Sequence, residues 1–206
     1  MKKIIGLIIL LVLVSSCGVK EEEKDYTTGE IDGIKYEETT EVSDNIKIQM
    51  ANGDIILLEL YPDIAPITVE NFQKLIQEKF YSGSTFHRVM KGFMIQGGRN
   101  KDGKEADTIK GEFLNNGFDN YLNHDRGVIS MARKGNDMDS ASSEFFIVHQ
   151  KTPSLDRDYA SFGKVIAGMS IVDKIASTPV DSTDANFPVP LSPQVIKSIT
   201  FINILD

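Results

Sequence analysis

The sequence predicts a mainly β protein with a closed antiparallel sheet and two helices. Three observations indicate this fold class. Short apolar runs recur along the chain between turns rich in glycine, asparagine and proline, as strands joined by turns do. Only two stretches place apolar residues at helical spacing. The sequence has no repeating strand-helix-strand pattern, which argues against a parallel α/β sheet.

The first elements are a hairpin and a helix. Ile46–Met50 alternates, Asn52-Gly53 marks a tight turn, and Ile55–Leu60 is a second apolar run, so we expect two antiparallel strands. Pro66 suits a first helical turn. The residues after it form one apolar helical face, which predicts a contact with the core through Val69, Phe72, Leu75 and Ile76.

The second half of the chain predicts three further strands, a helix and a closing strand. Residues 99–126 are polar and contain several glycines, which is typical of a long surface connection. An apolar helical face follows Gly168 and ends before Pro179. The expected strands are Val128–Met131, Phe145–His149, Ser161–Val165 and Val195–Leu205.

The stretch 86–98 holds the residues that best suit a functional site. It contains one fixed cation, Arg88, followed by the apolar Phe93 and Met94 and the amide Gln96. We expect two short strands that meet at a glycine-containing turn to put Arg88 and Phe93 on one sheet face. An arginine beside an apolar floor suits the holding of a peptide, because the guanidinium stays charged and offers several donors.

Other chemistries are disfavoured. His87 adjoins the arginine, but neighbouring strand residues point to opposite faces, so we expect His87 to face away from the site. His124 and His149 have no spacing that makes a metal pair with each other or with His87. We therefore expect no metal and no cofactor. A hydrolase built on Ser142-Ser143 would need a paired base, and the nucleophile elbow of such enzymes is missing.

The N-terminal residues predict export and a lipid anchor. Residues 1–16 combine a basic start with an apolar run too short to span a membrane, which is typical of a secretory signal peptide. Val14-Ser15-Ser16-Cys17 resembles the bacterial lipobox, in which cleavage leaves the cysteine as a lipid-bearing N-terminus. Cys17 is the only cysteine in the chain, so no disulfide framework is expected. The alternative is a plain signal peptide whose cleavage site includes a cysteine.

An acidic segment follows the signal peptide. Residues 18–44 contain ten acidic side chains against three lysines, so we expect residues 17–44 to form a solvated tether with a transient strand near Ile31–Tyr36. The alternative is an acidic arm that recruits basic partners. The globular domain is predicted to span residues 45–206. The net charge of −8 and the lack of a basic stripe disfavour nucleic-acid binding, and without a coiled-coil pattern we expect a monomer.

Five separated motifs occur in a characteristic order over residues 46–205. They are Phe86–Gly98, Gly127–Ala132, Ser143–Ile147, Leu155-Asp156 and Ser161–Val165. In this order they resemble the cyclophilin family of peptidyl-prolyl cis-trans isomerases. The resemblance implies an eight-stranded β-barrel capped by two helices. It also implies catalysis of rotation about the peptide bond before proline, without a covalent intermediate, metal or cofactor.

Carried over position by position, the resemblance implies a role for each residue of a binding site. Arg88 corresponds to the catalytic arginine. Gln96 corresponds to the amide that binds the substrate backbone and helps to orient that arginine. The walls and floor of the proline pocket correspond to Phe93, Met94, Phe146 and Leu155. The edge that binds the substrate backbone corresponds to Ala132 and Arg133.

Three residues depart from the family pattern. Glu144 stands where many members have a glutamine, and it adds a negative charge beside the groove. Ser154 stands where a tryptophan often precedes the leucine, and Tyr159 stands where eukaryotic members have a histidine. Because Arg88 and the apolar pocket remain, we expect isomerisation to be retained, with Glu144 and Tyr159 among the substrate-binding residues.

These assignments predict an exported isomerase that assists the folding of other exported proteins at proline bonds. Its partners would be proline-containing segments of those proteins and, through a lipid on Cys17, the extracytoplasmic side of a bacterial membrane. The alternative is a non-catalytic module that holds proline-containing segments as a chaperone or surface ligand. Arg88 and the apolar pocket favour the enzyme, whereas the negative charge of Glu144 keeps the non-catalytic module as an alternative.

Overall fold

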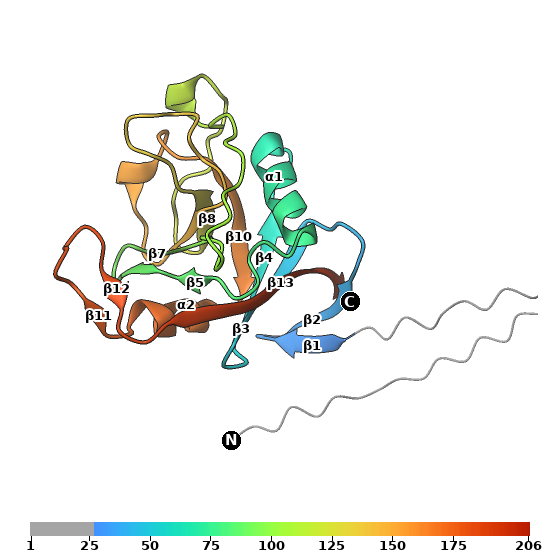
Figure 1. Cartoon of the computed structure of the whole chain (residues 1–206). Coiled ribbons are helices and arrows are strands. Elements are labelled where there is room, and N and C mark those ends of the chain that lie inside the picture. Colours follow the sequence, from blue (N-terminus) through green and yellow to red (C-terminus); the bar gives the residue numbers. More distant parts are fainter. Residues whose placement is uncertain (1–26) are drawn as a thin grey trace, which may run out of the picture.

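One antiparallel sheet dominates the computed structural model, which describes residues 27–206 (Figure 1). Its strands pair in the order β1-β2-β13-β3-β4-β10-β8-β9-β7-β6, and β5 pairs separately with β13. The strands are β1 (Thr28–Ile31), β2 (Ile34–Thr39), β3 (Asn45–Met50), β4 (Ile55–Leu60), β5 (Thr85–Phe86), β6 (Arg88–Met90), β7 (Met94–Gly97), β8 (Val128–Met131), β9 (Phe145–Val148), β10 (Ser161–Ala167) and β13 (Gln194–Leu205). Two short strands, β11 (Val180–Asp181) and β12 (Val189–Pro190), form a second small sheet.

Two α-helices accompany the sheet, and the predicted mainly antiparallel β class with two helices is confirmed. They are α1 (Pro66–Gln77) and α2 (Met169–Ala176), which lie in different parts of the molecule (Figure 1). Two 3-10 turns, η1 (Leu114–Asn116) and η2 (Pro153–Leu155), lie in the loops. Within residues 27–206, no helix is both long enough and apolar enough to cross a membrane.

The local patterns explain the elements that carry the fold. β3 and β4 form the predicted hairpin, with Ile46 opposite Leu58. In the turn between them, Gly53 has a φ of +91°, in the left-handed region that favours glycine. Pro66 begins α1, where a missing N–H costs nothing. The predicted apolar face of this helix is buried and consists of Val69, Phe72, Leu75 and Ile76.

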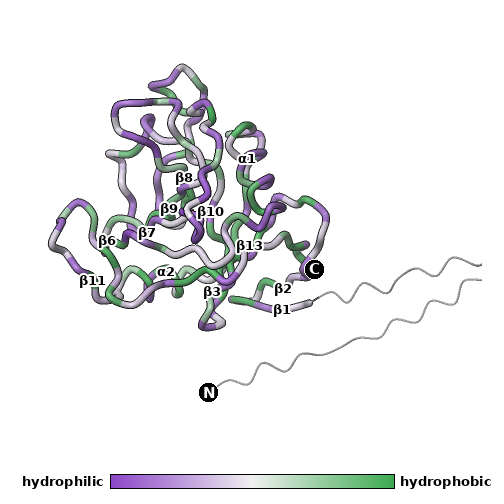
Figure 2. The backbone as a smooth tube through the Cα atoms, viewed as in Figure 1, coloured by the Kyte–Doolittle hydropathy of each residue, from purple (hydrophilic) through white to green (hydrophobic). Residues whose placement is uncertain are grey.

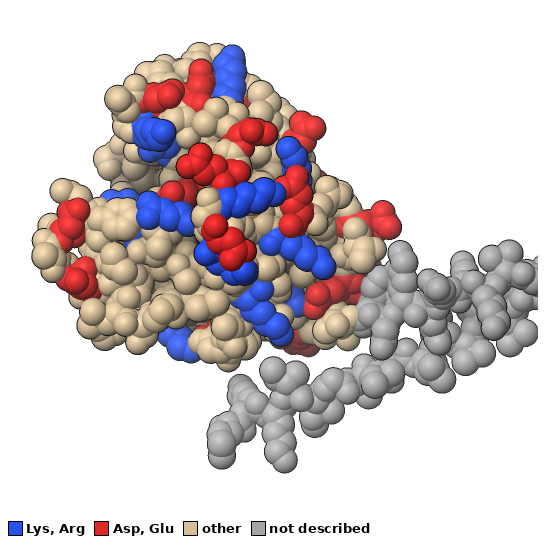
Figure 3. All heavy atoms as spheres, in the orientation of Figure 1, with Lys and Arg blue, Asp and Glu red and all other residues tan. Residues whose placement is uncertain are grey.

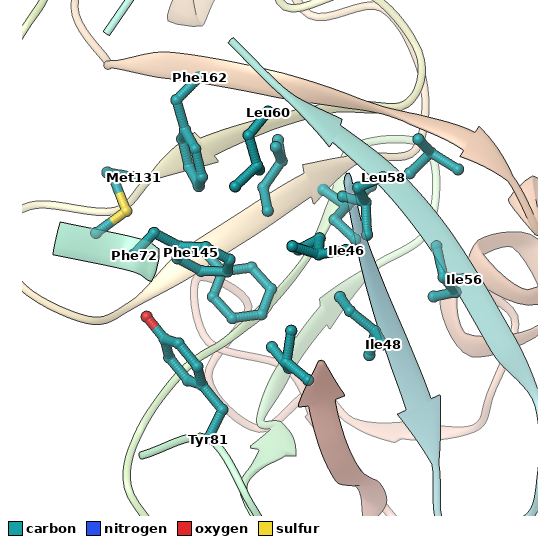
Figure 4. Close-up of a cluster of buried hydrophobic side chains, with 14 of the residues drawn as sticks. Ile46, Ile48, Ile56, Leu58, Leu60, Phe72, Tyr81, Met131, Phe145 and Phe162 are labelled. Atoms are coloured by element: carbon teal, nitrogen blue, oxygen red, sulfur yellow. The ribbon is translucent and has the colours of Figure 1, made fainter. Parts of the chain in front are cut away.

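An aromatic cluster fills the core. Phe72 of α1 is fully buried, and its ring centroid lies 5.1 to 5.4 Å from those of Tyr81, Phe145 and Phe162. Figure 4 shows these rings next to aliphatic side chains of β3 and β4, namely Ile46, Ile48, Ile56, Leu58 and Leu60. Because side chains alternate along a strand, Phe145 in the core leaves its neighbour Phe146 on the other face of β9.

Charged and hydrophilic residues lie outside this core. Figure 2 shows largely hydrophilic residues along the long loops, in contrast to the hydrophobic residues along parts of β13 and α2. On the face shown in Figure 3, acidic and basic side chains are interspersed and neither sign forms a continuous stripe. This face therefore lacks the basic stripe typical of a nucleic-acid interface.

Residues 28–39 correct the prediction of a solvated tether up to residue 44. They form β1 and β2, and β2 pairs with the end of β13, with Tyr36 opposite Ile204. Tyr36 is buried in a small cluster with Leu57, Ala167 and Ile202. The segment was predicted as a tether because it is acidic, although Ile34 and Tyr36 alternate in it. These two side chains find apolar partners only when β13 lies beside β2. The strand expected as transient is thus part of the sheet.

Two predictions lie beyond what the described residues establish. The signal peptide of residues 1–16 and the lipidated Cys17 fall outside residues 27–206. The closed eight-stranded barrel also stays a prediction, because the path of paired strands among the described residues ends at β6 and does not return to its start.

Candidate functional site

A pocket of about 160 Å³ lies on the face of the sheet opposite the core, beside β6, β7 and β9. It brings together nine of the ten residues predicted to act on the substrate and adds one that was not predicted, Phe187. The lining residues are Arg88, Phe93, Met94, Gln96, Ala132, Arg133, Phe146, Leu155, Tyr159 and Phe187. Glu144 is the predicted residue that does not line this pocket.

The β6–β7 hairpin positions the arginine and the amide. Arg88 pairs directly with Gln96, and Met90 pairs with Met94, so these four side chains share one face of the sheet. Phe93 does line the pocket, as predicted, but strand alternation is not the reason. Phe93 precedes β7, outside the alternation, and it reaches the pocket from the turn.

A histidine holds that turn in place. The His149 backbone N–H donates to the Phe93 carbonyl oxygen at 2.9 Å, and the Gly92 N–H donates to His149 Nδ1 at 3.0 Å. The other ring nitrogen, Nε2, lies 3.3 Å from an Asp173 carboxylate oxygen on α2. Since Nδ1 accepts, the proton of the neutral ring is on Nε2, where it faces the carboxylate. His149 thereby links the turn that carries Phe93 to a helix.

Three contacts orient the Arg88 guanidinium. Its Nε donates to the Asn186 carbonyl oxygen at 2.8 Å, Nη1 donates to Gln96 Oε1 at 2.9 Å, and Nη2 contacts Met90 Sδ at 3.3 Å. Burial lowers the pKa of Arg88, while the charges of Tyr159, Asp184 and Glu144 act in the opposite direction. An arginine stays protonated at any working pH, so the pocket has a permanent cation at its wall.

The floor opposite this cation is apolar and firmly supported. Met94 and Phe146 are buried, and the ring of Phe146 meets that of Tyr159 edge-on at 5.7 Å. Beneath Phe146, the buried ring of His124 stacks at 5.9 Å. His124 Nδ1 lies 3.0 Å from Asp156, and burial, the largest effect, lowers the pKa of this histidine. His124 is thus a structural support of the floor, not a lining residue.

Arg133 forms one edge of the pocket, and its guanidinium donates to backbone carbonyl oxygens of neighbouring residues. Its Nε donates to the Asp158 carbonyl oxygen at 2.9 Å, and Nη1 donates to the Lys134 carbonyl oxygen at 3.1 Å. The guanidinium carbon lies 4.9 Å from the ring centroid of Tyr159 and 5.2 Å from that of Phe113. Stacking between two rings holds the guanidinium in place.

Glu144 lies behind the pocket, accepts hydrogen bonds from two polar side chains and lies close to a third. Gln96 Nε2 donates to Glu144 Oε2 at 2.8 Å, and Arg99 Nε donates to Oε1 at 2.9 Å. His87 Nε2 lies 3.2 Å from Oε2. Glu144 thus lies beside the groove, where its charge acts on Arg88, but it is not among the lining residues, so its expected substrate-binding role gains no support from the pocket. His87, as expected, is not among the lining residues.

Sequence reasoning missed the contribution of the loop before β12. Phe187 lines the pocket, and its ring lies 5.9 Å from the Arg88 guanidinium carbon and 5.1 Å from that of Arg99. It also stacks on His87 at 5.8 Å. A lone aromatic before proline in a stretch of small polar residues was the available signal. Because about a hundred positions separate Phe187 from Arg88, nothing in the sequence indicated that the two side chains lie together.

Metal chemistry has no support in the described part of the chain. No group of three or more His, Cys, Asp or Glu side chains within residues 27–206 is arranged to hold a metal ion. The site offers instead two arginines, Arg88 and Arg133, one oriented amide and an apolar pocket. Such a set can grip a peptide segment and place donors against it.

The balance of effects on Glu144 predicts how stability depends on pH. Burial raises the pKa of Glu144, but hydrogen bonds and charge from His87 and Arg99 outweigh burial and lower it to about 2. A carboxylate with a lowered folded-state pKa stabilises the fold above its unfolded pKa, and this contribution declines as pH falls toward about 2. A shift from 4.5 to about 2 corresponds to at most about 3.5 kcal/mol at about 1.4 kcal/mol per pKa unit, and solvent screening of the partly exposed carboxylate makes the contribution smaller.

Urea unfolding of the parent and of Glu144→Gln at pH 7 and pH 3 measures this contribution. We expect the parent to be the more stable protein at pH 7 and the difference to shrink at pH 3. A difference that stays the same at both pH values would contradict the assigned pairing of Glu144.

Comparisons with known proteins agree with this geometry. Residues 45–200 match the family described as cyclophilin type peptidyl-prolyl cis-trans isomerase/CLD. A peptidyl-prolyl cis-trans isomerase of Acinetobacter baylyi is 42% identical over 165 residues, covering 75% of this chain and 85% of that protein. Peptidyl-prolyl cis-trans isomerase B of Bacillus subtilis is 41% identical over 134 residues, covering 64% of this chain and 90% of that protein.

A solved structure extends the comparison to the fold. The crystal structure of a Cryptosporidium parvum cyclophilin type peptidyl-prolyl cis-trans isomerase, in the presence of the dipeptide Ala-Pro, has a TM-score of 0.63 at 27% identity. The match covers 76% of this chain and 98% of the Cryptosporidium parvum chain. The antiparallel sheet with its arginine-walled apolar pocket thus defines a peptide-binding isomerase of the cyclophilin class. The chain belongs to the cyclophilin-type peptidyl-prolyl cis-trans isomerase family, and it is a peptidyl-prolyl cis-trans isomerase.

Proposed function

We propose that Arg88 accelerates isomerisation by stabilising the twisted form of the peptide bond before proline. Rotation must break amide resonance, which costs about 18–20 kcal/mol for peptide bonds. In the twisted amide, the nitrogen loses its delocalisation and becomes a hydrogen-bond acceptor. A donor aimed at that nitrogen stabilises the transition state more than either planar state, which is what catalysis requires. The observation that carries this proposal is the guanidinium held at the pocket wall by Gln96 and Asn186.

The apolar floor acts separately from the cation. We propose that the proline ring lies against four apolar side chains, namely Phe93, Met94, Phe146 and Leu155. A fixed ring lets the segment on the other side of the bond turn, and an apolar wall favours the less polar twisted amide. The substrate backbone would lie along Ala132 and Arg133 and meet the amide of Gln96. Tyr159 closes the floor against Phe146.

We further propose that the chain Thr85–Met90 closes the sheet into an eight-stranded barrel. β5 pairs with β13 through Phe86 and Gln194, and β6 pairs with β7 through Arg88 and Gln96. A single residue separates β5 from β6. Counted as one strand, this segment would link β13 to β7 and complete a ring with β3, β4, β10, β8 and β9. In that arrangement Arg88 stands on the closing strand.

In the cell, we propose that this isomerase assists the folding of exported proteins at proline bonds while anchored by a lipid on Cys17. Support comes from the signal-like residues 1–16, the lipobox-like Val14–Cys17 and the acidic residues that precede the domain. Uncatalysed isomerisation takes tens to hundreds of seconds, so proteins that fold after export would benefit from a tethered catalyst on the extracytoplasmic side.

Labelling in a bacterial host tests the anchor. Cells that make the full chain with radiolabelled palmitate are expected to yield a labelled protein in the membrane fraction, because a diacyl anchor binds membranes stably. Cys17→Ser should lose both the label and the membrane fraction, whereas Arg88→Ala should keep both. An unlabelled parent, or a labelled Cys17→Ser protein, would contradict the proposed anchor.

The non-catalytic module gains no support from the site. Its main argument was the negative charge of Glu144 beside the groove, and this carboxylate accepts from Gln96 and Arg99 and does not line the pocket. The proposed function is therefore tested as catalysis. The readout is the rate of cis-trans exchange in a short peptide that contains proline.

A further inference from the structure

The amide of Gln96 is held from both sides. Its Oε1 accepts from Arg88 Nη1 at 2.9 Å, and its Nε2 donates to Glu144 Oε2 at 2.8 Å. The residue is buried, with 9% of its surface exposed. A guanidinium can only donate and an ionised carboxylate can only accept. One orientation of the amide satisfies both neighbours, and the flipped orientation would place donor against donor and acceptor against acceptor.

The backbone keeps the carboxylate in place. Gly98 has a φ of +97°, and a Cβ at this position would lie 2.4 Å from the Ser143 carbonyl oxygen. The segment after β7 therefore passes close to the segment before β9, as glycine allows. The next residue, Arg99, extends from this crossing and binds Glu144 Oε1. The guanidinium carbons of Arg99 and Arg88 both lie near the Phe187 ring, at 5.1 Å and 5.9 Å from its centroid.

We propose that Glu144 is a positioning residue that fixes the Gln96 amide and, through it, the direction of the Arg88 guanidinium. Glu144 does not line the pocket, so it acts without touching the substrate. Arg99 serves as its anchor. Glutamine at position 144 would offer both a donor and an acceptor to the same amide, and so both orientations of Gln96 would find a partner. A carboxylate removes that ambiguity. This inference rests on the proposed role of Arg88.

Steady-state kinetics of the full chain test the proposal with Glu144→Gln and a matched control. The control is Glu78→Gln at the end of α1, which loses an exposed ion pair with Lys104 at 3.5 Å. We expect Glu144→Gln to lower kcat about three- to tenfold, the size of one misplaced hydrogen bond, with KM changed less than about twofold. The reason is that the arginine acts in the twisted state, not in substrate binding. Glu78→Gln should match the parent.

A second variant tests the path through Arg99. Arg99→Gln should lower kcat in the same direction, because it removes the charged donor that holds Glu144 Oε1. The double variant should then lose no more than Glu144→Gln alone, since both substitutions break one path. Losses that multiply in the double variant, or a kcat for Glu144→Gln equal to that of the parent, would overturn the proposal. An equal loss in Glu78→Gln would overturn it as well, because the effect would then be general.

The side-chain amide signals of Gln96 give a readout that does not depend on turnover. In the parent, NMR should show one sharp pair of Nε2 protons, hydrogen-bonded and slow to exchange. Glu144→Gln should broaden or double this pair, whereas Glu78→Gln should leave it unchanged. Unaltered Gln96 signals in Glu144→Gln would overturn the proposal. If Arg88→Ala keeps the kcat of the parent, the proposed role of Arg88 fails instead, and the amide signals still show whether Glu144 fixes Gln96.

Discussion

Arg88→Ala is expected to lower kcat/KM for a short proline peptide by about 100-fold or more, the usual cost of deleting one transition-state donor. The structure gives two reasons. The guanidinium of Arg88 is a permanent cation at the pocket wall, and Gln96 and Asn186 hold it there before substrate arrives. Exchange kinetics measured on the full chain and the variant give the ratio directly.

Two further variants make this prediction specific. Arg88→Lys keeps the charge but loses the planar fork, so it should also be strongly impaired. Lys104→Ala removes a cation that pairs with Glu78 at 3.5 Å outside the pocket, and it should match the parent. An Arg88→Ala protein within about threefold of the parent would show that the barrier falls by another route.

Phe72→Ala is expected to reduce the free energy of unfolding by about 3–5 kcal/mol, as for other large buried aromatic residues. Phe72 is fully buried, and its ring contacts Tyr81, Phe145 and Phe162 from three other segments. The remaining rings belong to separate segments and cannot all shift to fill the cavity. Urea unfolding followed by tyrosine fluorescence or circular dichroism measures the loss.

A neighbour on the same helix is the control. Ile67 of α1 is 40% exposed, so Ile67→Ala should change stability by no more than about 0.5 kcal/mol. The folded fraction of Phe72→Ala should keep much of its activity, because the pocket lies on the other face of β9. A loss under about 1 kcal/mol for Phe72→Ala would mean that the aromatic cluster does not hold the fold together as described.

The parts of the fold that depend on local patterns were predictable from the sequence. The β3–β4 hairpin followed from alternation and Asn52-Gly53, and α1 followed from Pro66 and its apolar face. The β1–β2 hairpin was not predicted as stable structure. Its strand β2 is stabilised by β13, more than 160 positions away, and a composition of charged residues gave no sign of that partner.

The candidate site shows the same division. The β6–β7 hairpin is local, so Arg88, Met94 and Gln96 could be placed together from the sequence. Phe187 could not, because only the tertiary fold brings its loop to Arg88. Glu144 lies beside the groove, as the sequence suggested, but its partner Arg99 could not be predicted. Only the crossing at Gly98 brings Arg99 to this carboxylate.

A catalytic pocket turns over proline peptides and does not merely hold them. NMR exchange spectroscopy on a short Xaa-Pro peptide, with a small amount of the full chain, measures this at equilibrium. We predict that the cis-trans exchange rate rises in proportion to the protein concentration while the cis-to-trans ratio stays constant. Peptide that binds, as seen by shifts of pocket resonances, but still exchanges over tens to hundreds of seconds as in water, would contradict it.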